Sequence, residues 1–225
     1  MERHFDIELR SLKNELIKMA GFVEQSVAYA VEAIRAQDPN IAQTKFKQIF
    51  EVERKVNQAH KDVDDACVKL LALQQPLAAD LRLIVAIIKM NSDLERMGDQ
   101  AVNIAHNSER FLKLEPKQTM EDLVVMGDEV RTMVRGALDC FINRDGEMAR
   151  KILALDDSID EARNRIFSEM KTYLKTHPEN IEHGFNVIFI ARNLERIGDH
   201  ATNIAEDVVF AITGEDIRHG GSKGV

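Results

Sequence analysis

Carboxylate and amide side chains recur at helical spacing in two nearly identical stretches of this sequence. Leu94 to Ala105 reads LERMGDQAVNIA, Leu194 to Ala205 reads LERIGDHATNIA, and the two differ at three positions. In a helix, residues four apart lie on the same face. Each stretch therefore predicts an oxygen-rich stripe, formed by Glu95, Asp99 and Asn103 in the first copy and by Glu195, Asp199 and Asn203 in the second.

A second pair of oxygen donors precedes each stretch. Glu53 and Asn57 are one helical turn apart, and Asp156 and Asp160 align with them in the second half of the chain. Such oxygens bind hard or borderline cations, and adjacent carboxylates can be shared between ions. We therefore predict one or more divalent or trivalent ions in each half, with iron, zinc, manganese or magnesium as candidates.

The alternative interpretation of these acids is a set of surface ion pairs. Arginines and lysines are close by in the sequence, and exposed ion pairs of this kind contribute little to stability. The repetition of the whole pattern in both halves favours metal binding over this alternative. The arginines that would neutralise the acids are Arg96, Arg192 and Arg196.

The elements that position these residues are predicted to be six long amphipathic helices. Apolar residues recur at spacings of three and four along most of the chain, and proline or turn residues interrupt the pattern. Because the twelve-residue stretch returns after 100 residues, we predict an all-α fold of two tandem three-helix bundles related by internal duplication. The predicted units are 1–115 and 116–213, with a flexible tail at 214–225; the helices run over about 4–37, 40–75, 76–113, 120–143, 147–176 and 179–213.

Composition excludes several functional classes. The formal net charge of −8 argues against general nucleic-acid binding, which relies on basic surfaces. The N-terminus has no signal-peptide pattern and no apolar run could span a bilayer, so we expect a cytoplasmic protein. Cys67 and Cys140 are far apart in apolar helical patterns and are interpreted as core thiols.

No catalytic residue can be named. A di-iron oxidase would use Glu-x-x-His pairs, and no Glu in this sequence has His three residues later. Nucleophile-elbow, P-loop and Rossmann glycine patterns are also missing from the sequence. We therefore predict that the protein is not an enzyme, and that His60, His106 and His200 lie outside the metal's direct ligands.

Taken together, these motifs resemble the PhoU proteins, accessory regulators of bacterial phosphate uptake. The resemblance rests on QQPLAADLR at 74–82, on the two twelve-residue stretches and on the order of six helices. It implies metal clusters held on the surface by two E/DxxxD pairs per repeat. Asn57 departs from that pattern because an amide brings no negative charge, so we expect the first site to bind more weakly. The residues that match the pairs are Glu53, Asn57, Glu95, Asp99, Asp156, Asp160, Glu195 and Asp199.

The resemblance also implies a function. It implies a negative regulator of phosphate uptake and of the phosphate-starvation response, which affects transcription indirectly as an adaptor. The implied partners are the ATPase of the phosphate ABC transporter and the phosphate-sensing histidine kinase, so that the protein is peripheral to the membrane. Apolar faces that one bundle cannot fully bury predict a homodimer. The alternatives are a metal-dependent, carboxylate-bridged enzyme and a passive metal-binding helical bundle.

Overall fold

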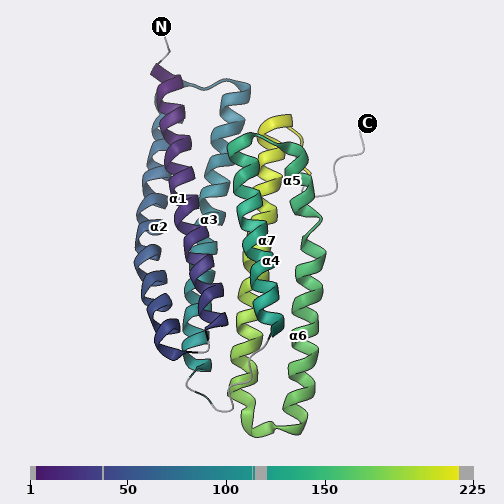
Figure 1. Cartoon of the computed structure of the whole chain (residues 1–225). Helices are drawn as coiled ribbons and strands as arrows, with labels where there is room; N and C mark the ends of the chain where they lie inside the picture. The colour runs from purple at the N-terminus through teal and green to yellow at the C-terminus, as the bar shows by residue number, and fades with distance from the viewer. Residues whose placement is uncertain (1–3, 37, 113, 115–120, 218–225) are drawn as a thin grey trace.

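Two bundles of long antiparallel helices lie side by side (Figure 1). A computed structural model describes residues 4–36, 38–112, 114 and 121–217, and within them every regular element is a helix. This confirms the predicted fold of two tandem three-helix bundles. The first bundle contains α1 (His4–Arg35), α2 (Pro39–Gln74) and α3 (Ala78–Phe111). The second contains α4 (Glu121–Asn143), α5 (Gly146–Leu153), α6 (Asp156–Thr176) and α7 (Ile181–Thr213), with the 3-10 turn η1 (Pro178–Asn180) before α7.

The core is made of the apolar stripes that the helical periodicity predicts. In both copies of the duplicated stretch the four apolar positions are buried, at Leu94, Met97, Ala101 and Ile104 and at Leu194, Ile197, Ala201 and Ile204.

The two cysteines lie in the core as free thiols. Burial, with a smaller effect of Asp64, raises the pKa of Cys67 to about 12. Burial also raises the pKa of Cys140 to about 11, followed by the effect of nearby carboxylates. Both thiols stay protonated at neutral pH, which agrees with their interpretation as packing residues.

Capping residues fix two of the helix ends that matter for the topology, the start of α2 and the end of α7. The Asp38 side chain accepts a hydrogen bond from the Asn40 amide at 2.8 Å, and Pro39 opens α2, where its missing N–H costs nothing. At the other end of the chain Gly214 takes φ 81° and donates its N–H to the Phe210 carbonyl, which closes α7 as predicted.

Three predicted helix ends differ from the structure. The helix α1 ends at Arg35 rather than Gln37, and α3 ends at Phe111 rather than near residue 113. Pro76 lies before α3 instead of in its first turn, because Gln75 turns into the left-handed region at φ 45° and delays the helix until Ala78. The predicted domain boundary at 115/116, a capping role for Thr119 and most of the predicted tail lie outside the described residues.

The fifth predicted helix is wrong as a single element. It is divided at Ala154 and Leu155 into α5 and α6, although neither proline nor glycine stands at the break. Arg150 and Lys151 lie in the last turn of α5, while Asp156 and Asp157 lie in the first turn of α6. These charges stabilise the helix ends that the break creates, because they oppose the helix dipoles.

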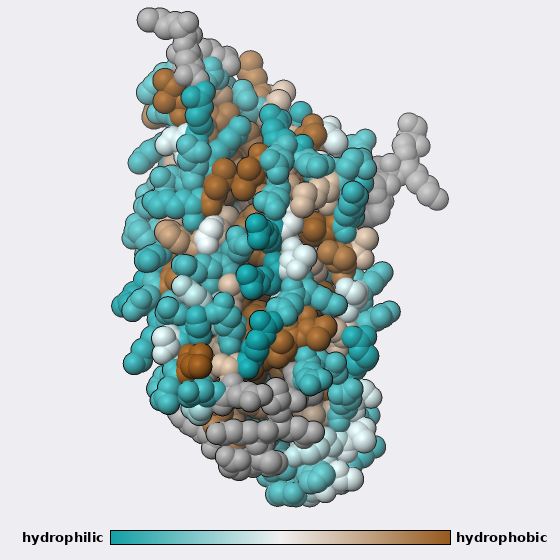
Figure 2. Space-filling model, viewed as in Figure 1, coloured by the Kyte–Doolittle hydropathy of each residue, from teal (hydrophilic) through white to brown (hydrophobic). Residues whose placement is uncertain are grey.

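The antiparallel helices α3 and α7 form the main contact between the repeats. Their polar contacts are specific: His200 Nδ1 lies 2.8 Å from Asp93 Oδ1, and Asn203 donates to the same oxygen at 3.2 Å. Nearer the end of the bundle, Lys89 Nζ lies 3.5 Å from Asp207, whose side chain is 1% exposed. On the face crossed by α1 and α4, separate hydrophobic patches lie beside a column of hydrophilic residues (Figure 2).

Candidate metal centres

In the second repeat, four carboxylates come from the facing sides of α6 and α7. The break before α6 places Asp156 in the first turn of that helix and Asp160 one turn later, while Glu195 and Asp199 follow each other on α7. Burial and then the charges of Asp199 and Asp160 raise the pKa of Asp156 above its ordinary value. The pKa of Asp199 is raised by burial and then by Asp160. The two helices therefore bring their carboxylates close enough to repel one another.

Arg163 lies among these carboxylates. Its Nη2 atom is 3.2 Å from Asp160 Oδ1 and 3.5 Å from Glu195 Oε1, so that one guanidinium bridges α6 and α7. Even so, the pKa of Glu195 is raised, because burial and the Asp199 charge outweigh the opposing effect of Arg163. The sequence analysis did not name Arg163 as a partner of the acids. Arg163 lies three residues after Asp160 on the same helix face, and this spacing was the signal in the sequence that would have identified it as a partner.

In the first repeat the corresponding residues lie on α2 and α3. Asn57 donates from Nδ2 to Glu53 Oε1 at 2.9 Å, within one turn of α2. Burial, followed by the charge of Glu53, raises the pKa of Asp99 on the neighbouring helix. Glu95 lies half-buried one turn before Asp99. This repeat thus has fewer carboxylates, as the sequence indicates, and His60 occupies the position that aligns with Arg163.

The close approach of the paired helices depends on a glycine in each repeat. A Cβ atom added to Gly98 would lie 3.3 Å from Val56 Cγ1 on α2, and one added to Gly198 would lie 3.5 Å from Ile159 Cγ2 on α6. The prediction of another helix passing close to both glycines is confirmed. The contact brings Asp99 and Asp199, the next residues, beside the acids of the facing helix.

The carboxylate and amide oxygens of both repeats are of the chemical type that binds a cation. Their side chains would have to rearrange to surround one. Within the described part of the chain, no three His, Cys, Asp or Glu side chains are already gathered around one point. Burial and neighbouring carboxylates raise the pKa of Asp99 in the first repeat and of Asp199 in the second, and a divalent cation would offset this repulsion. In the second repeat Arg163 takes that compensating position.

The two additional donors, Asn103 and Asn203, and the three histidines are engaged elsewhere or exposed. Asn203 donates to Asp93 across the repeats, and His200 contacts the same carboxylate. His60 Nε2 lies 3.5 Å from Asp64, and the His106 ring packs on Phe50 with centroids 5.1 Å apart. Asn103 is exposed on α3. Asp93, which sequence analysis did not single out, links the acidic helix of one repeat to that of the other, as Lys89 does through Asp207.

Next to the second acidic group is an open groove of about 500 Å³. Three arginines border it, and apolar side chains of α6 and α7 form its floor. Its lining residues are Arg163, Phe167, Ile188, Ala191, Arg192, Glu195, Arg196 and Asp199.

These features define a class of protein: a duplicated three-helix bundle that carries an acidic helix pair in each repeat. Comparison with known proteins identifies the family. The PhoU domain matches residues 16–108 and 123–208, one copy in each bundle. The chain belongs to the PhoU family.

Named relatives cover almost the whole chain. The phosphate-specific transport system accessory protein PhoU homolog of Pseudomonas putida is 39% identical over 99% of this chain and 86% of its own length. The phosphate-specific transport system accessory protein PhoU of Escherichia coli K12 is 32% identical over 96% of this chain and 88% of its own length. Both names describe accessory proteins rather than enzymes.

Solved structures of PhoU proteins have the same fold. PhoU from Pseudomonas aeruginosa superposes with a TM-score of 0.87 at 36% identity, over 94% of this chain and all of that chain. The phosphate transport system regulatory protein PhoU from Streptococcus pneumoniae gives 0.84 at 30% identity, over 95% and 99% of the two chains. Along the described residues, no helix has the length and apolar character needed to cross a membrane.

Proposed function

We propose that this protein is an accessory regulator of a phosphate-specific transport system. It represses phosphate uptake and the phosphate-starvation response as a metal-binding adaptor between the transporter ATPase and a sensor histidine kinase, without turning over a substrate. The observation that carries the proposal is the duplicated acidic helix pair in a chain of the PhoU family, whose relatives are named as accessory proteins. The protein acts in the cytoplasm and reaches the membrane through its partners.

The metal part of the proposal rests on the carboxylates that are crowded between paired helices. Glu53, Asn57, Glu95 and Asp99 would hold metal in the first repeat, and Asp156, Asp160, Glu195 and Asp199 in the second. A bound cation would neutralise the acids and tie each pair of helices together. An iron, manganese, magnesium or zinc ion suits these oxygen ligands, and zinc is the softest of the four.

Measurement of the bound metal content tests the proposed metal binding directly. Elemental analysis of protein purified without chelator or affinity metal should find metal in the parent, and less in Asp99→Ala and in Asp199→Ala. The larger loss is expected for Asp199→Ala, because its repeat has more carboxylates. Asp62→Ala, an exposed acid outside both pairs, is the control. Parental metal content in both variants would refute metal binding at these acids, and a larger loss for Asp99→Ala would reverse the ranking of the two sites.

The adaptor part is supported by an exposed apolar stripe on α7. Ile181, Phe185 and Phe189 follow one another at four-residue spacing, and the two phenylalanines remain 48% and 44% exposed. Their rings stack with centroids 6.1 Å apart beside an open groove that Arg110 and Glu182 border. Exposed aromatic side chains of this kind contribute strongly to protein interfaces.

Pull-down with the transporter ATPase and with the kinase tests the stripe. The double variant Phe185→Ala/Phe189→Ala should recover less of at least one partner than the parent does. Leu73→Ala, which removes an exposed leucine on the first bundle, should recover the parental amount. Unchanged recovery of both partners in the double variant would remove the stripe from the proposal. Light scattering of the same proteins measures whether they form the proposed homodimer.

Deletion of the gene tests the regulatory conclusion. In its host, the deletion strain should express starvation genes in ample phosphate, and the Phe185→Ala/Phe189→Ala variant should restore repression less well than the parent gene. Normal repression in a deletion strain without a second homologue would end the adaptor proposal. The metal-dependent enzyme would then become the first hypothesis.

A further inference from the structure

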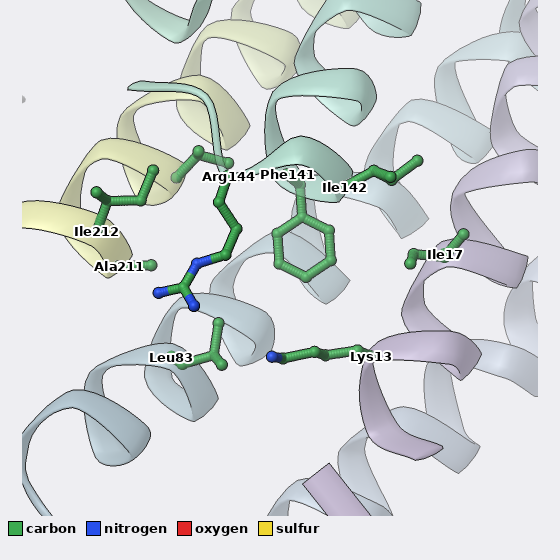
Figure 3. Close-up of a pocket in the computed structure, with 9 residues that line it drawn as sticks. Lys13, Ile17, Leu83, Phe141, Ile142, Arg144, Ala211 and Ile212 are labelled. Atoms are coloured by element: carbon green, nitrogen blue, oxygen red, sulfur yellow. The ribbon is translucent and has the colours of Figure 1, made fainter. Parts of the chain in front are cut away.

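A small apolar cavity lies in the seam between the two repeats, away from both acidic groups. Figure 3 shows side chains of α1, α3, the C-terminal end of α4 and the last turns of α7 around it. The cavity encloses about 90 Å³. Its apolar lining includes Ile17 of the first repeat and Phe141, Val208, Ala211 and Ile212 of the second, with Leu83 below.

Two cations point into this cavity from opposite repeats. The Lys13 ammonium and the Arg144 guanidinium both reach the space between Leu83 and Phe141 (Figure 3). Burial and then the Arg144 charge lower the pKa of Lys13, Arg10 lowers it further, and the carboxylate of Asp80 opposes them. Within the described residues, neither cation of the pair forms a side-chain hydrogen bond or ion pair. A protein of net charge −8 thus holds two like charges together at an apolar opening.

The backbone holds Arg144 there at a cost. Arg144 follows α4 with φ 53°, in the left-handed region that helix ends usually fill with glycine. The Asp145 amide donates to the Cys140 carbonyl at 3.0 Å and the Arg144 amide to Phe141 at 3.3 Å, the two bonds of a Schellman motif. A side chain at this position is less favourable than glycine, so the turn itself does not require arginine there.

We propose that the seam cavity binds a short branched aliphatic carboxylate. The hydrocarbon group occupies the cavity, and the carboxylate lies between Lys13 and Arg144. A cavity of about 150 Å³ accepts benzene, so 90 Å³ suits an aliphatic group of about four carbons. A guanidinium fork matches a carboxylate, and the second cation completes its compensation. Because the lining comes from both repeats, the bound anion links them.

Isovalerate is the probe, since it joins a four-carbon branched group to a carboxylate. Calorimetric titration of the full-length protein should detect binding of isovalerate. Isovaleramide, which has the same shape without the charge, and acetate, which has the charge without the branched group, should each bind at least about tenfold more weakly. Equal binding of isovaleramide would overturn the role of the cations, and equal binding of acetate or inorganic phosphate would overturn the role of the cavity.

The variant Arg144→Gly distinguishes a loss of ligand binding from a loss of stability. Glycine relieves the left-handed backbone, so the variant should melt about 2–4 °C higher than the parent. It should also bind isovalerate at least about tenfold more weakly. Arg150→Gln, on the neighbouring helix, is the matched control and should bind as the parent does. Parental affinity in Arg144→Gly would overturn the proposal.

A second variant fills the cavity and keeps both cations. Ala211→Leu should lose isovalerate binding while its circular dichroism spectrum stays helical. Parental binding in folded Ala211→Leu would place the ligand elsewhere and overturn the proposal. If this variant does not fold, Arg144→Gly and isovaleramide still decide the outcome.

Discussion

The Arg163 guanidinium lies 3.5 Å from the Glu195 carboxylate, although the two residues belong to different helices. The same guanidinium contacts Asp160, so a single cation compensates acids of both α6 and α7. A metal ion bound at the proposed site of the second repeat would have to compete with Arg163 for these carboxylates. In the first repeat the aligned position is His60, whose Nε2 lies near Asp64 instead.

Arg163→Gln is therefore expected to strengthen metal binding in the second repeat. Removal of the guanidinium frees Asp160 and Glu195 and leaves their repulsion for a cation to relieve. Titration with Mn²⁺ or Zn²⁺, followed by calorimetry, should show a lower dissociation constant than in the parent. Arg165→Gln, an exposed arginine on the same helix, controls for the change in net charge. Weaker binding in Arg163→Gln would instead show that the arginine holds the acids in a binding arrangement.

The crowded acids should also make the metal-free protein less stable at neutral pH. A carboxyl group whose pKa is higher in the folded state than in the unfolded chain prefers to be protonated when folded. Its contribution to the free energy of unfolding therefore falls as the pH rises from the ordinary carboxyl range through the raised pKa, and stays low above it. Burial and then Asp160 raise the pKa of Asp199, so this residue follows that rule.

Asp199→Asn tests the sign. In the presence of chelator the variant should melt above the parent at pH 7, and the difference should shrink towards zero on acidification to about pH 4. Glu51→Gln, an exposed acid of α2, is the control and should show a smaller difference at pH 7. A melting temperature of Asp199→Asn below the parent's at pH 7 would mean that its carboxylate is stabilised rather than crowded.

Helical periodicity and the internal duplication predict most of the fold from the sequence. The apolar stripes of α3 and α7 repeat position by position, and the buried residues of the duplicated stretches follow from them. The break at Ala154 and Leu155 could not be predicted in this way, because no glycine or proline marks it. The charges of Arg150, Lys151, Asp156 and Asp157 stabilise the two helix ends at the break.

The candidate site was predictable within a repeat but not between repeats. Spacing alone placed Asp156 with Asp160 and Glu195 with Asp199 on helix faces. Asp93 and His200 are 107 residues apart, and their contact depends on how α3 packs on α7. An internal repeat specifies matching positions in two bundles, not the register in which the bundles meet.

Asp93→Ala should destabilise this contact between repeats. The substitution leaves His200 and Asn203 without the oxygen that both contact, in a largely buried position. The free energy of unfolding, measured by urea denaturation, should fall by about 1–3 kcal/mol. Asn193→Ala at the matching position of the second repeat is the control, because Asn193 donates only within its own helix, to the Phe189 carbonyl. A larger loss for Asn193→Ala would contradict the importance of the Asp93 contact.

Gly98→Ala and Gly198→Ala should differ in their effect on stability. Alanine in a helix interior is favoured over glycine by about 1 kcal/mol, a gain that both substitutions offer. At Gly198 the new Cβ would make an ordinary contact, 3.5 Å from Ile159, so Gly198→Ala should raise the free energy of unfolding by up to about 1 kcal/mol. At Gly98 the new Cβ would lie 3.3 Å from Val56, whose branched side chain is buried and stiff.

Part or all of the gain at Gly98 is therefore lost in repacking. Urea unfolding of the two variants beside the parent, with chelator present, should place Gly198→Ala above Gly98→Ala. Because Asp99 and Asp199 follow these glycines, the same variants also report on spacing at the acidic pairs. Metal titration should show a larger loss of affinity for Gly98→Ala, since its helices must move apart to accept the methyl group. If Gly98→Ala were instead the more stable variant, α2 would accommodate the added methyl group on α3 more easily than α6 accommodates the one on α7.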